Sequence, residues 1–361
     1  MKPFIFILLL LSAGIVRGDD LVIVDAADGS PVIGASVTGR SGIISGITDI
    51  SGTVRGMSPA DYPYTVHSLG YKNTLVSASA DTLRLVADTY SLPEVVVKPG
   101  ERPVIRTLSY VREYCTGASG SDTIQMFSEY MAETFVIDGK EKVKGYKSYD
   151  ARPTVKNARR VARIVKAGTD SISTPTDNEE FLSFFECISF IPTETFTESD
   201  SLRSGLVPAD TVHGKYYPKR IMRRTDNLFI VQNDGLADKK GHKWSPMFFK
   251  LLGLTMEMQT VNASLAYAAN DKGVYGRDDF IYGTYSSHIL GKGKWIRKML
   301  SVDKPIGMDC YVEMYPVSTT RLTVDEYKAQ RDDWTRIPFE VSPLAPPLHS
   351  SVQRMIDCLG K

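Results

Sequence analysis

The stretch DGSPVIGASV (Asp28–Val37) places a tight turn directly in front of an alternating strand. Glycine supplies positive φ and proline fixes φ, so the residues DGSP are typical of a turn. Gly34 interrupts the apolar run that follows, at a point where a strand must bulge or where a side chain would clash. Because the preceding residues LVIVDA also have the pattern of a strand, the stretch predicts a hairpin at the start of a β domain.

Turn residues divide the next fifty positions in the same way. GIISGITDISGTV carries a turn at Asp49–Gly52, PYTVHSLGYKNTLV alternates between two faces, and DTLRLV is a further short strand. Short strands separated by turn residues over about eighty residues predict a small antiparallel sandwich.

Residues 1–18 precede this sandwich and have the layout of a secretory signal peptide. Lys2 is followed by the apolar run Phe4–Leu11 and then by small residues. The run is much shorter than the ~20 residues of a bilayer span. We expect cleavage between Gly18 and Asp19, and a mature chain in the periplasm or associated with the outer membrane; an uncleaved anchor is the alternative.

Four motifs in the first hundred residues carry a family resemblance. They are GSPVIGASV, GITDISG (Gly46–Gly52), VHSLGY (Val66–Tyr71) and LPEVVV (Leu92–Val97), in that order. Together they resemble the carboxypeptidase regulatory-like domain, a transthyretin-like β-sandwich, at the N-terminus of secreted Bacteroidetes envelope proteins. The resemblance covers residues 19–98. It implies an accessory sandwich, which is attached to peptidases in some proteins and to outer-membrane transporters in others.

Residues 99–334 are expected to form an α+β domain with a largely antiparallel sheet. This part weakly resembles Bacteroidetes outer-membrane-associated proteins of unknown function. Val104, Leu108, Val111 and Cys115 recur at helical spacing and predict a helix, with Arg112 and Glu113 on its surface.

Other segments of this part have their own signals. IQMFSEYMAETFVIDG (124–139) and LFIVQN (228–233) predict strands, whereas residues 192–211 predict a polar loop. NARRVARIVKAG (157–168) fits either a basic helix face or a strand. Helices are predicted for SPMFFKLLGLTMEM (245–258), and for TVDEYKAQRDDW from a capping box of Thr323 and Glu326. Residues 335–361 predict a Pro-rich tail, extended over the surface, with a short C-terminal helix.

Composition and motifs exclude several kinds of chemistry. The formal net charge of +1 gives no overall field to recruit nucleic acid. None of the five histidines has Glu three residues later, so the zinc site of a carboxypeptidase is not predicted. TGASGS (116–121) lacks the G-x-S-x-G spacing, and GKGKW (291–295) lacks that of a phosphate-binding loop. We therefore predict no catalytic, cofactor-binding or metal residue, and no cofactor.

The four cysteines are widely spaced and form no C-x-x-C motif. In an oxidising compartment they allow three pairings into two disulfides, and buried thiols are the alternative. The residues concerned are Cys115, Cys187, Cys310 and Cys358.

Two functions fit these observations. The first is a non-enzymatic cell-envelope protein whose accessory sandwich docks onto a protein, glycan or membrane-surface partner. The alternative is a secreted hydrolase whose site is assembled from distant residues, with His213, His242 or His288 beside an Asp and a Ser.

Bacteroidetes envelope proteins, which the N-terminal motifs resemble, are often O-glycosylated at Asp followed by Ser or Thr and an apolar residue. Triplets of this kind recur in the chain at Asp81, Asp122, Asp170, Asp200 and Asp210. Ser201 and Thr211 are the candidate sites, because they lie in or beside the predicted polar loop. Turn chemistry is the structural alternative for these triplets.

Overall fold

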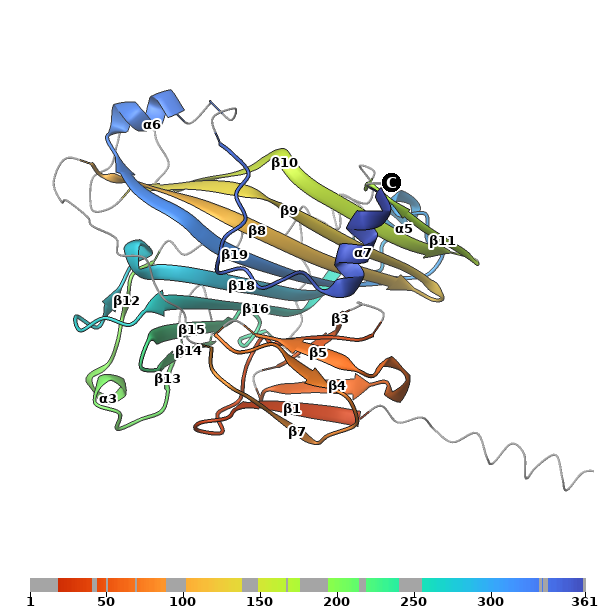
Figure 1. Ribbon diagram of the computed structural model, residues 1–361, viewed down its shortest axis with the longest axis horizontal. Coiled ribbons are helices and arrows are strands. Elements are labelled where there is room, and N and C mark those ends of the chain that lie inside the picture. Colours follow the sequence, from red (N-terminus) through yellow and green to blue (C-terminus); the bar gives the residue numbers. More distant parts are fainter. Residues whose placement is uncertain are drawn as a thin grey trace, which may run out of the picture. The chain divides into compact units, whose positions relative to one another are not determined.

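The computed structural model describes most of the chain between residues 19 and 359. The described ranges are 19–40, 44–49, 51–68, 70–88, 102–137, 149–166, 168–175, 194–213, 219–239, 255–330, 333 and 337–359. The chain divides into two compact units, the first reaching Ala87 without Gly42–Ile44, and the second running from Asp88 together with those three residues. The protein is mostly β, with small sheets in the first unit, a ten-stranded antiparallel sheet in the second and a few short helices (Figure 1).

The first unit contains two small sheets around one core. A three-stranded sheet has the order β4-β1-β7, and a four-stranded sheet has the order β3-β2-β5-β6. The bounds are β1 Asp19–Asp25, β2 Ser36–Thr38, β3 Ile44–Ile47, β4 Thr53–Met57, β5 Tyr64–His67, β6 Thr74–Val76 and β7 Thr82–Leu85, with a 3-10 turn at Pro59–Asp61. Both sheets contribute to one apolar cluster that includes Ile23, Val37, Tyr64 and Leu85. The predicted sandwich was wholly antiparallel, but β1 and β7 pair in parallel.

Two of the quoted motifs, GSPVIGASV and GITDISG, form turns of the first unit, whereas LPEVVV (Leu92–Val97) lies outside the described residues. Thr48 is fully buried, and its Oγ1 accepts a hydrogen bond from the Ala35 amide at 2.8 Å and donates one to the Val32 carbonyl at 2.6 Å. Asp49 Oδ1 accepts hydrogen bonds from the Ser51 and Thr53 amides. These contacts close the turn before β4 and tie it to the first hairpin.

The second unit is built on the large sheet. Its strand order is β11-β10-β9-β8-β19-β18-β16-β15-β14-β13. The bounds are β8 Val104–Ser119, β9 Asp122–Ile137, β10 Tyr149–Lys166, β11 Thr169–Ser173, β13 Asp210–Val212, β14 Lys219–Arg224, β15 Leu228–Asp234, β16 Met256–Ala268, β18 Phe280–Gly291 and β19 Ile306–Leu322. The confirmed antiparallel sheet therefore extends over long strands of up to 18 residues.

Short elements lie around this sheet. β12 (Phe196–Thr197) pairs with β17 (Val274–Tyr275). The helices are α3 Asp200–Arg203, a 3-10 turn at Arg277–Asp279, α5 Lys294–Met299, α6 Val324–Gln330 and α7 Ser350–Leu359. None of the helices within the described ranges is long and apolar enough to span a membrane.

Side chains alternate along each strand, so the large sheet has two distinct faces. On one, the core face, Val111 and Val312 pack in a cluster with Phe196, Leu202 and Tyr275 from the segments around β12, α3 and β17. On the other, the tail face, the main packing partners come from the C-terminal segment. There Phe127 and Val161 pack against Val352 and Met355 of α7.

The helix predicted over residues 104–115 is wrong, because these residues form the first three quarters of β8. Both faces of β8 are covered, so nearly every residue of the strand is buried. Among so many buried residues, a helical spacing of apolar side chains arises by coincidence. Arg112 and Glu113 lie on opposite faces of the strand. Both are buried, not at the surface of a helix.

Two further predictions in the second unit need correction. The polar loop at 192–211 contains β12, α3 and β13. The predicted helix at 245–258 lies largely outside the described residues, and its last three residues, from Met256, belong to β16. The ambiguous segment 157–168 forms part of β10.

The predicted ends of the second unit are confirmed in part. Thr323 and Glu326 form the expected capping box, with the Thr323 amide donating to Glu326 Oε2 at 2.7 Å and the Glu326 amide donating to Thr323 Oγ1 at 3.1 Å. The tail does end in a helix, α7. The tail is packed more closely than the predicted extended segment on the surface, since Ile337 and Ser342 are buried.

Candidate functional site

A buried ionic cluster on the tail face is the most concentrated polar feature of the large sheet. Arg112 of β8 faces Glu129 of β9 on one side and Glu313 of β19 on the other, because both are its cross-strand partners. All three side chains are almost completely buried. Arg112 Nη1 lies 4.0 Å from Glu313 Oε2, and Arg159 of β10 donates to Glu129.

Tyrosines connect the members of this tail-face cluster. Arg112 Nε donates to Tyr110 Oη at 2.9 Å, and the Tyr110 hydroxyl donates to Glu129. Tyr315 donates to Glu313 at 3.2 Å. Burial raises the pKa of Tyr110 above its usual value, so this hydroxyl stays protonated and acts as a donor near neutral pH.

The chain's own tail covers this cluster. Arg112 Nη1 donates to the Pro346 carbonyl at 2.5 Å, and the Phe339 ring packs edge-on against Tyr110 at a centroid distance of 5.9 Å. Burial opposes the charge of Arg112, but Tyr114 and Glu313 outweigh it and raise the pKa of the guanidinium. The arginine therefore remains charged, and it anchors the tail.

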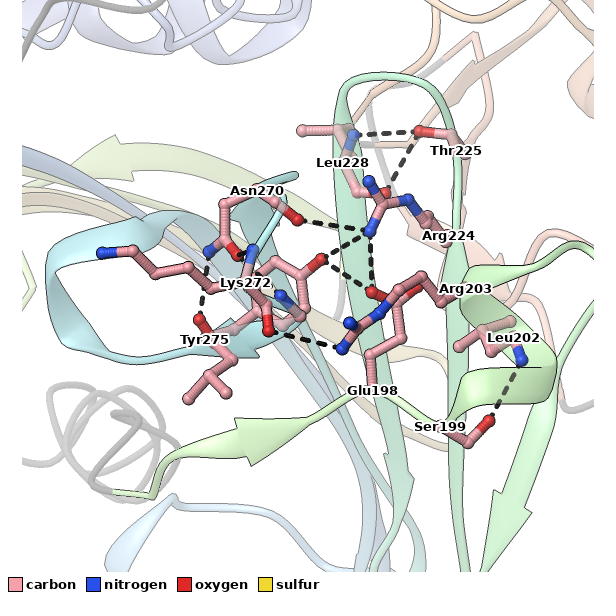
Figure 2. Close-up of polar contacts among 12 residues, drawn as sticks. Glu198, Ser199, Leu202, Arg203, Arg224, Thr225, Leu228, Asn270, Lys272 and Tyr275 are labelled. Carbon is pink, nitrogen blue, oxygen red and sulfur yellow. Dashed lines mark hydrogen bonds and ion pairs between the residues drawn. The ribbon is translucent and has the colours of Figure 1, made fainter.

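A second polar cluster joins β12 and β17 to β14. Figure 2 shows Arg224 and Tyr275 converging on Glu198, whose Oε2 accepts from Arg224 Nη1 at 2.7 Å and from the Tyr275 hydroxyl at 3.1 Å. Tyr275 also stacks on Phe229, with ring centroids 4.0 Å apart. Burial and the neighbouring Glu198 raise the pKa of Tyr275, which keeps its proton available for this hydrogen bond. The cluster holds the β12–β17 pair against the core face.

The candidate glycosylation residues lie next to this second cluster. Ser201 is in α3, Thr211 is in β13 at one edge of the large sheet, and both are exposed. The Ser199 hydroxyl donates to the Asp210 carboxylate and accepts from the Leu202 amide at 3.1 Å. Asp210, the Asp of the triplet that contains Thr211, therefore has a structural role in holding Ser199. Ser201 and Thr211 are exposed residues that a modifying enzyme can reach.

Three histidines were considered for a hydrolase. His242 lies outside the described residues, and His213 is exposed at the end of β13. His288 of β18 meets Asp309 of β19, with Nδ1 2.7 Å from Oδ1, and this hydrogen bond raises the pKa of the imidazole against the opposing effect of burial. The described residues place no hydroxyl in hydrogen-bond contact with this imidazole, so within them the pair is an oriented base without a triad.

The cysteine predictions divide between the faces of the large sheet. Cys115 and Cys310 are buried and directly opposite each other on β8 and β19, with their sulfur atoms 2.9 Å apart as thiols. Cys358 is exposed on α7, and Cys187 lies outside the described residues. Gly18 also lies outside, whereas Asp19 is the first residue of β1. Among the described residues, no group of three or more His, Cys, Asp and Glu side chains has the arrangement of a metal site.

The tail-face cluster and the Glu198 cluster were missed from sequence. The Arg112–Glu129 pair of the tail-face cluster had a signal in the sequence, because its opposite charges lie at matched distances from a turn. Gly120, with φ of 65°, joins β8 to β9, and counting outward from this turn brings Arg112 beside Glu129. The helical spacing of the apolar residues in this segment pointed to a helix instead.

Comparisons with known proteins give little more. No protein-family model matches the chain, and no curated protein matches it. Among solved structures, it is similar to lipovitellin, in a structure described as showing lipid–protein interactions, with a TM-score of 0.25 and 10% sequence identity. That match covers 62% of this chain and 26% of the lipovitellin chain, so the matched part spans about a quarter of the other protein's length. A likeness at this level carries no argument.

Proposed function

We propose that the protein is a non-enzymatic cell-envelope protein, exported by its N-terminal leader, in which the first unit is a carboxypeptidase regulatory-like sandwich that docks onto a partner. The observation that carries the proposal is the role of the motif residues in the first unit. Thr48 and Asp49 hydrogen-bond the backbone of two turns, and Gly52 supplies the positive φ of 74° within the turn that Asp49 closes. An accessory sandwich requires motif residues that stabilise its turns, and it does not require residues that carry out a reaction.

The second unit supports a structural role as well. Two of its buried charged groups hold other segments of the same chain. Arg112 holds the tail, and Glu198 holds the β12–β17 pair. Both faces of the large sheet are therefore packed by neighbouring parts of the same unit. This arrangement favours a rigid platform, and it leaves docking onto a protein, glycan or membrane-surface partner to the first unit.

Edge residues of the first unit allow a direct test of docking. Leu75 on the edge strand β6 is 61% exposed, and Val86, just after the edge strand β7, is 54% exposed. Edge strands with exposed apolar side chains are common sites of association. We expect the double variant Leu75→Glu, Val86→Glu to release the processed chain from the outer-membrane fraction into the periplasmic fraction several-fold.

The matched control is Leu206→Glu in the second unit, where Leu206 is 79% exposed. This variant carries the same kind of charge but should stay with the membrane fraction. Mass spectrometry of the fractions also tests cleavage between Gly18 and Asp19. Unprocessed chain in the cytoplasm, or equal retention of all three chains, would contradict the proposal.

The His288–Asp309 pair favours the second candidate, a secreted hydrolase, because it supplies an oriented base. A screen of the mature chain against ester, amide and glycoside substrates tests it. Hydrolysis that is lost in His288→Gln and kept in His67→Gln would favour the hydrolase over the docking protein.

A further inference from the structure

We propose that Cys115 and Cys310 form a disulfide that joins β8 to β19 in the mature protein. The two residues are direct cross-strand partners in the middle of a long antiparallel pairing. On both sides the register runs without interruption, from Gly307 opposite Ala118 to Pro316 opposite Ser109. The strands therefore hold the two side chains on the same face and at the same height.

The distances suit a covalent bond. The sulfur atoms are 2.9 Å apart, so a bond of about 2.04 Å requires an approach of only about 0.9 Å. Directly opposed residues of an antiparallel pair have Cβ atoms about 4.5–5.5 Å apart, slightly more than the about 3.5–4.5 Å of a disulfide. Small rotations about χ1 bring the sulfur atoms together, and a slight approach of the two strands supplies the rest.

The other described cysteine does not compete for this bond. Cys115 and Cys310 lie on the core face, in a cluster with Met126, Ile289 and Ile306. Cys358 is exposed on α7, which packs on the tail face. The sheet itself separates it from the pair.

The chemistry is thiol–disulfide exchange, with a protein or small-molecule disulfide as the oxidant. The thiolate of one cysteine attacks the oxidant and releases one of its thiols, which leaves a mixed disulfide. The second cysteine then attacks this mixed disulfide and releases the other thiol, so two protein thiols become one disulfide and the oxidant gains two thiols. Both cysteines are at most 3% exposed in the folded chain, so the exchange takes place before the core face closes.

Trypsin separates the two cysteines and makes the bond easy to detect. Cleavage yields the peptide Glu113–Lys140 with Cys115 and the peptide Met299–Arg321 with Cys310, while Cys187 lies in a third peptide. The full chain is purified under reducing conditions, unfolded, and refolded in a glutathione buffer that contains the oxidised form. Remaining thiols are then alkylated in denaturant before digestion. We expect the two peptides to be linked, with a combined mass lower by two hydrogen atoms.

Single variants provide the controls. The linked peptides should persist in Cys358→Ser and disappear in Cys115→Ser, where Cys310 becomes alkylated. The melting temperature of the second unit should fall by roughly 5–10 °C when the wild-type disulfide is reduced. Alkylation of both cysteines in the refolded wild-type chain, or a link from either of them to Cys187, would overturn the inference.

The glutathione experiment does not depend on where the protein resides. The inference rests on the proposed function in one respect: in the cell, export supplies the oxidising compartment in which the bond forms. A chain that forms the bond in the buffer but is isolated reduced from cells would count against export, and the pairing itself would be upheld.

Discussion

Arg112 is buried between two glutamates, and its loss removes a cation that pairs with Glu313. Removing one partner of a buried ion pair costs about 3–5 kcal/mol, because the remaining charge is left desolvated. We expect Arg112→Met, which conserves most of the volume, to lower the free energy of unfolding of the second unit by that amount. Urea unfolding followed by tryptophan fluorescence measures it, because all three tryptophans lie in this unit.

Arg163→Met is the control for this prediction. Arg163 pairs with Asp170 at 2.6 Å, but both side chains are substantially exposed. An exposed ion pair contributes at most about 1 kcal/mol. Equal losses in the two variants would show that burial does not set the strength of the Arg112 interactions.

His288 and His349 should respond to pH in opposite directions. The hydrogen bond to Asp309 raises the pKa of His288, so its stabilising effect is complete below the unfolded pKa of about 6.5 and is lost as the pH rises through the higher folded value. Burial, with a smaller effect of Arg354, lowers the pKa of His349, so protonation of the unfolded chain removes stability as the pH falls through about 6.5.

The free energy of unfolding, measured from pH 5 to pH 8 for His288→Gln and His349→Gln, tests these signs. The deficit of His288→Gln relative to wild type should shrink with rising pH. For His349→Gln, the difference from wild type should change in the opposite direction over the acid half of the range. Parallel pH profiles for the two variants would contradict both assignments.

A turn can require glycine because its φ is positive or because a side chain would clash, and Gly52 and Gly29 of the first unit distinguish these two causes. Both have positive φ, at 74° and 73°. A Cβ on Gly52 would lie 2.5 Å from the Ile23 carbonyl oxygen, whereas one on Gly29 would meet nothing within 4 Å. We expect Gly29→Ala to cost about 1–2 kcal/mol from the backbone alone, and Gly52→Ala to cost clearly more. Thermal unfolding of the first unit by near-UV circular dichroism checks the order, and a larger loss for Gly29→Ala would contradict it.

At the scale of elements, the tail depends on α7 for its attachment. Met355 and Val352 pack against Phe127 and Val161 of the tail face. Truncating a buried methionine to alanine costs about 2–5 kcal/mol. We expect Met355→Ala to loosen α7 and to accelerate tryptic cleavage after Arg354 several-fold. Gln353→Ala, at an exposed position of the same helix, should leave the cleavage rate unchanged, and similar rates in both variants would mean that packing on the sheet does not hold α7.

The elements also show why some predictions succeeded and others did not. The capping box at Thr323 and Glu326 is local chemistry, and it predicted the start of α6 correctly. β8 carries no such local signal, since its burial comes from β9, β19 and the tail, which are distant in sequence. Its apolar spacing therefore fitted a helix equally well. Recognising the turn at Gly120 would have favoured a hairpin and predicted the Arg112–Glu129 pair.

At the scale of the whole molecule, the two units differ in how their sequences encode them. The first unit depends on turn residues such as Thr48 and Gly52, which act within a few positions and can be recognised as motifs. The second depends on long strand pairings, and its charged clusters arise only once those strands are in register. The fold of the first unit was accordingly predictable in outline, whereas the polar clusters of the second were not.

This difference predicts that the first unit folds without the second. Its apolar cluster, which includes Leu21, Val54 and Val66, draws on both of its sheets. The domain predicted from the sequence is residues 19–98. A chain of about eighty residues lies above the 55–65 residues at which many domains fold alone. We expect residues 19–98 to unfold cooperatively on heating and to give the same amide chemical shift for Ala35, the donor to Thr48, as in the full chain. Tyr64→Ala, which removes a fully buried side chain, should lower the melting temperature. A gradual transition, or a shift for Ala35 typical of unfolded chain, would mean that the sandwich requires residues beyond Lys98.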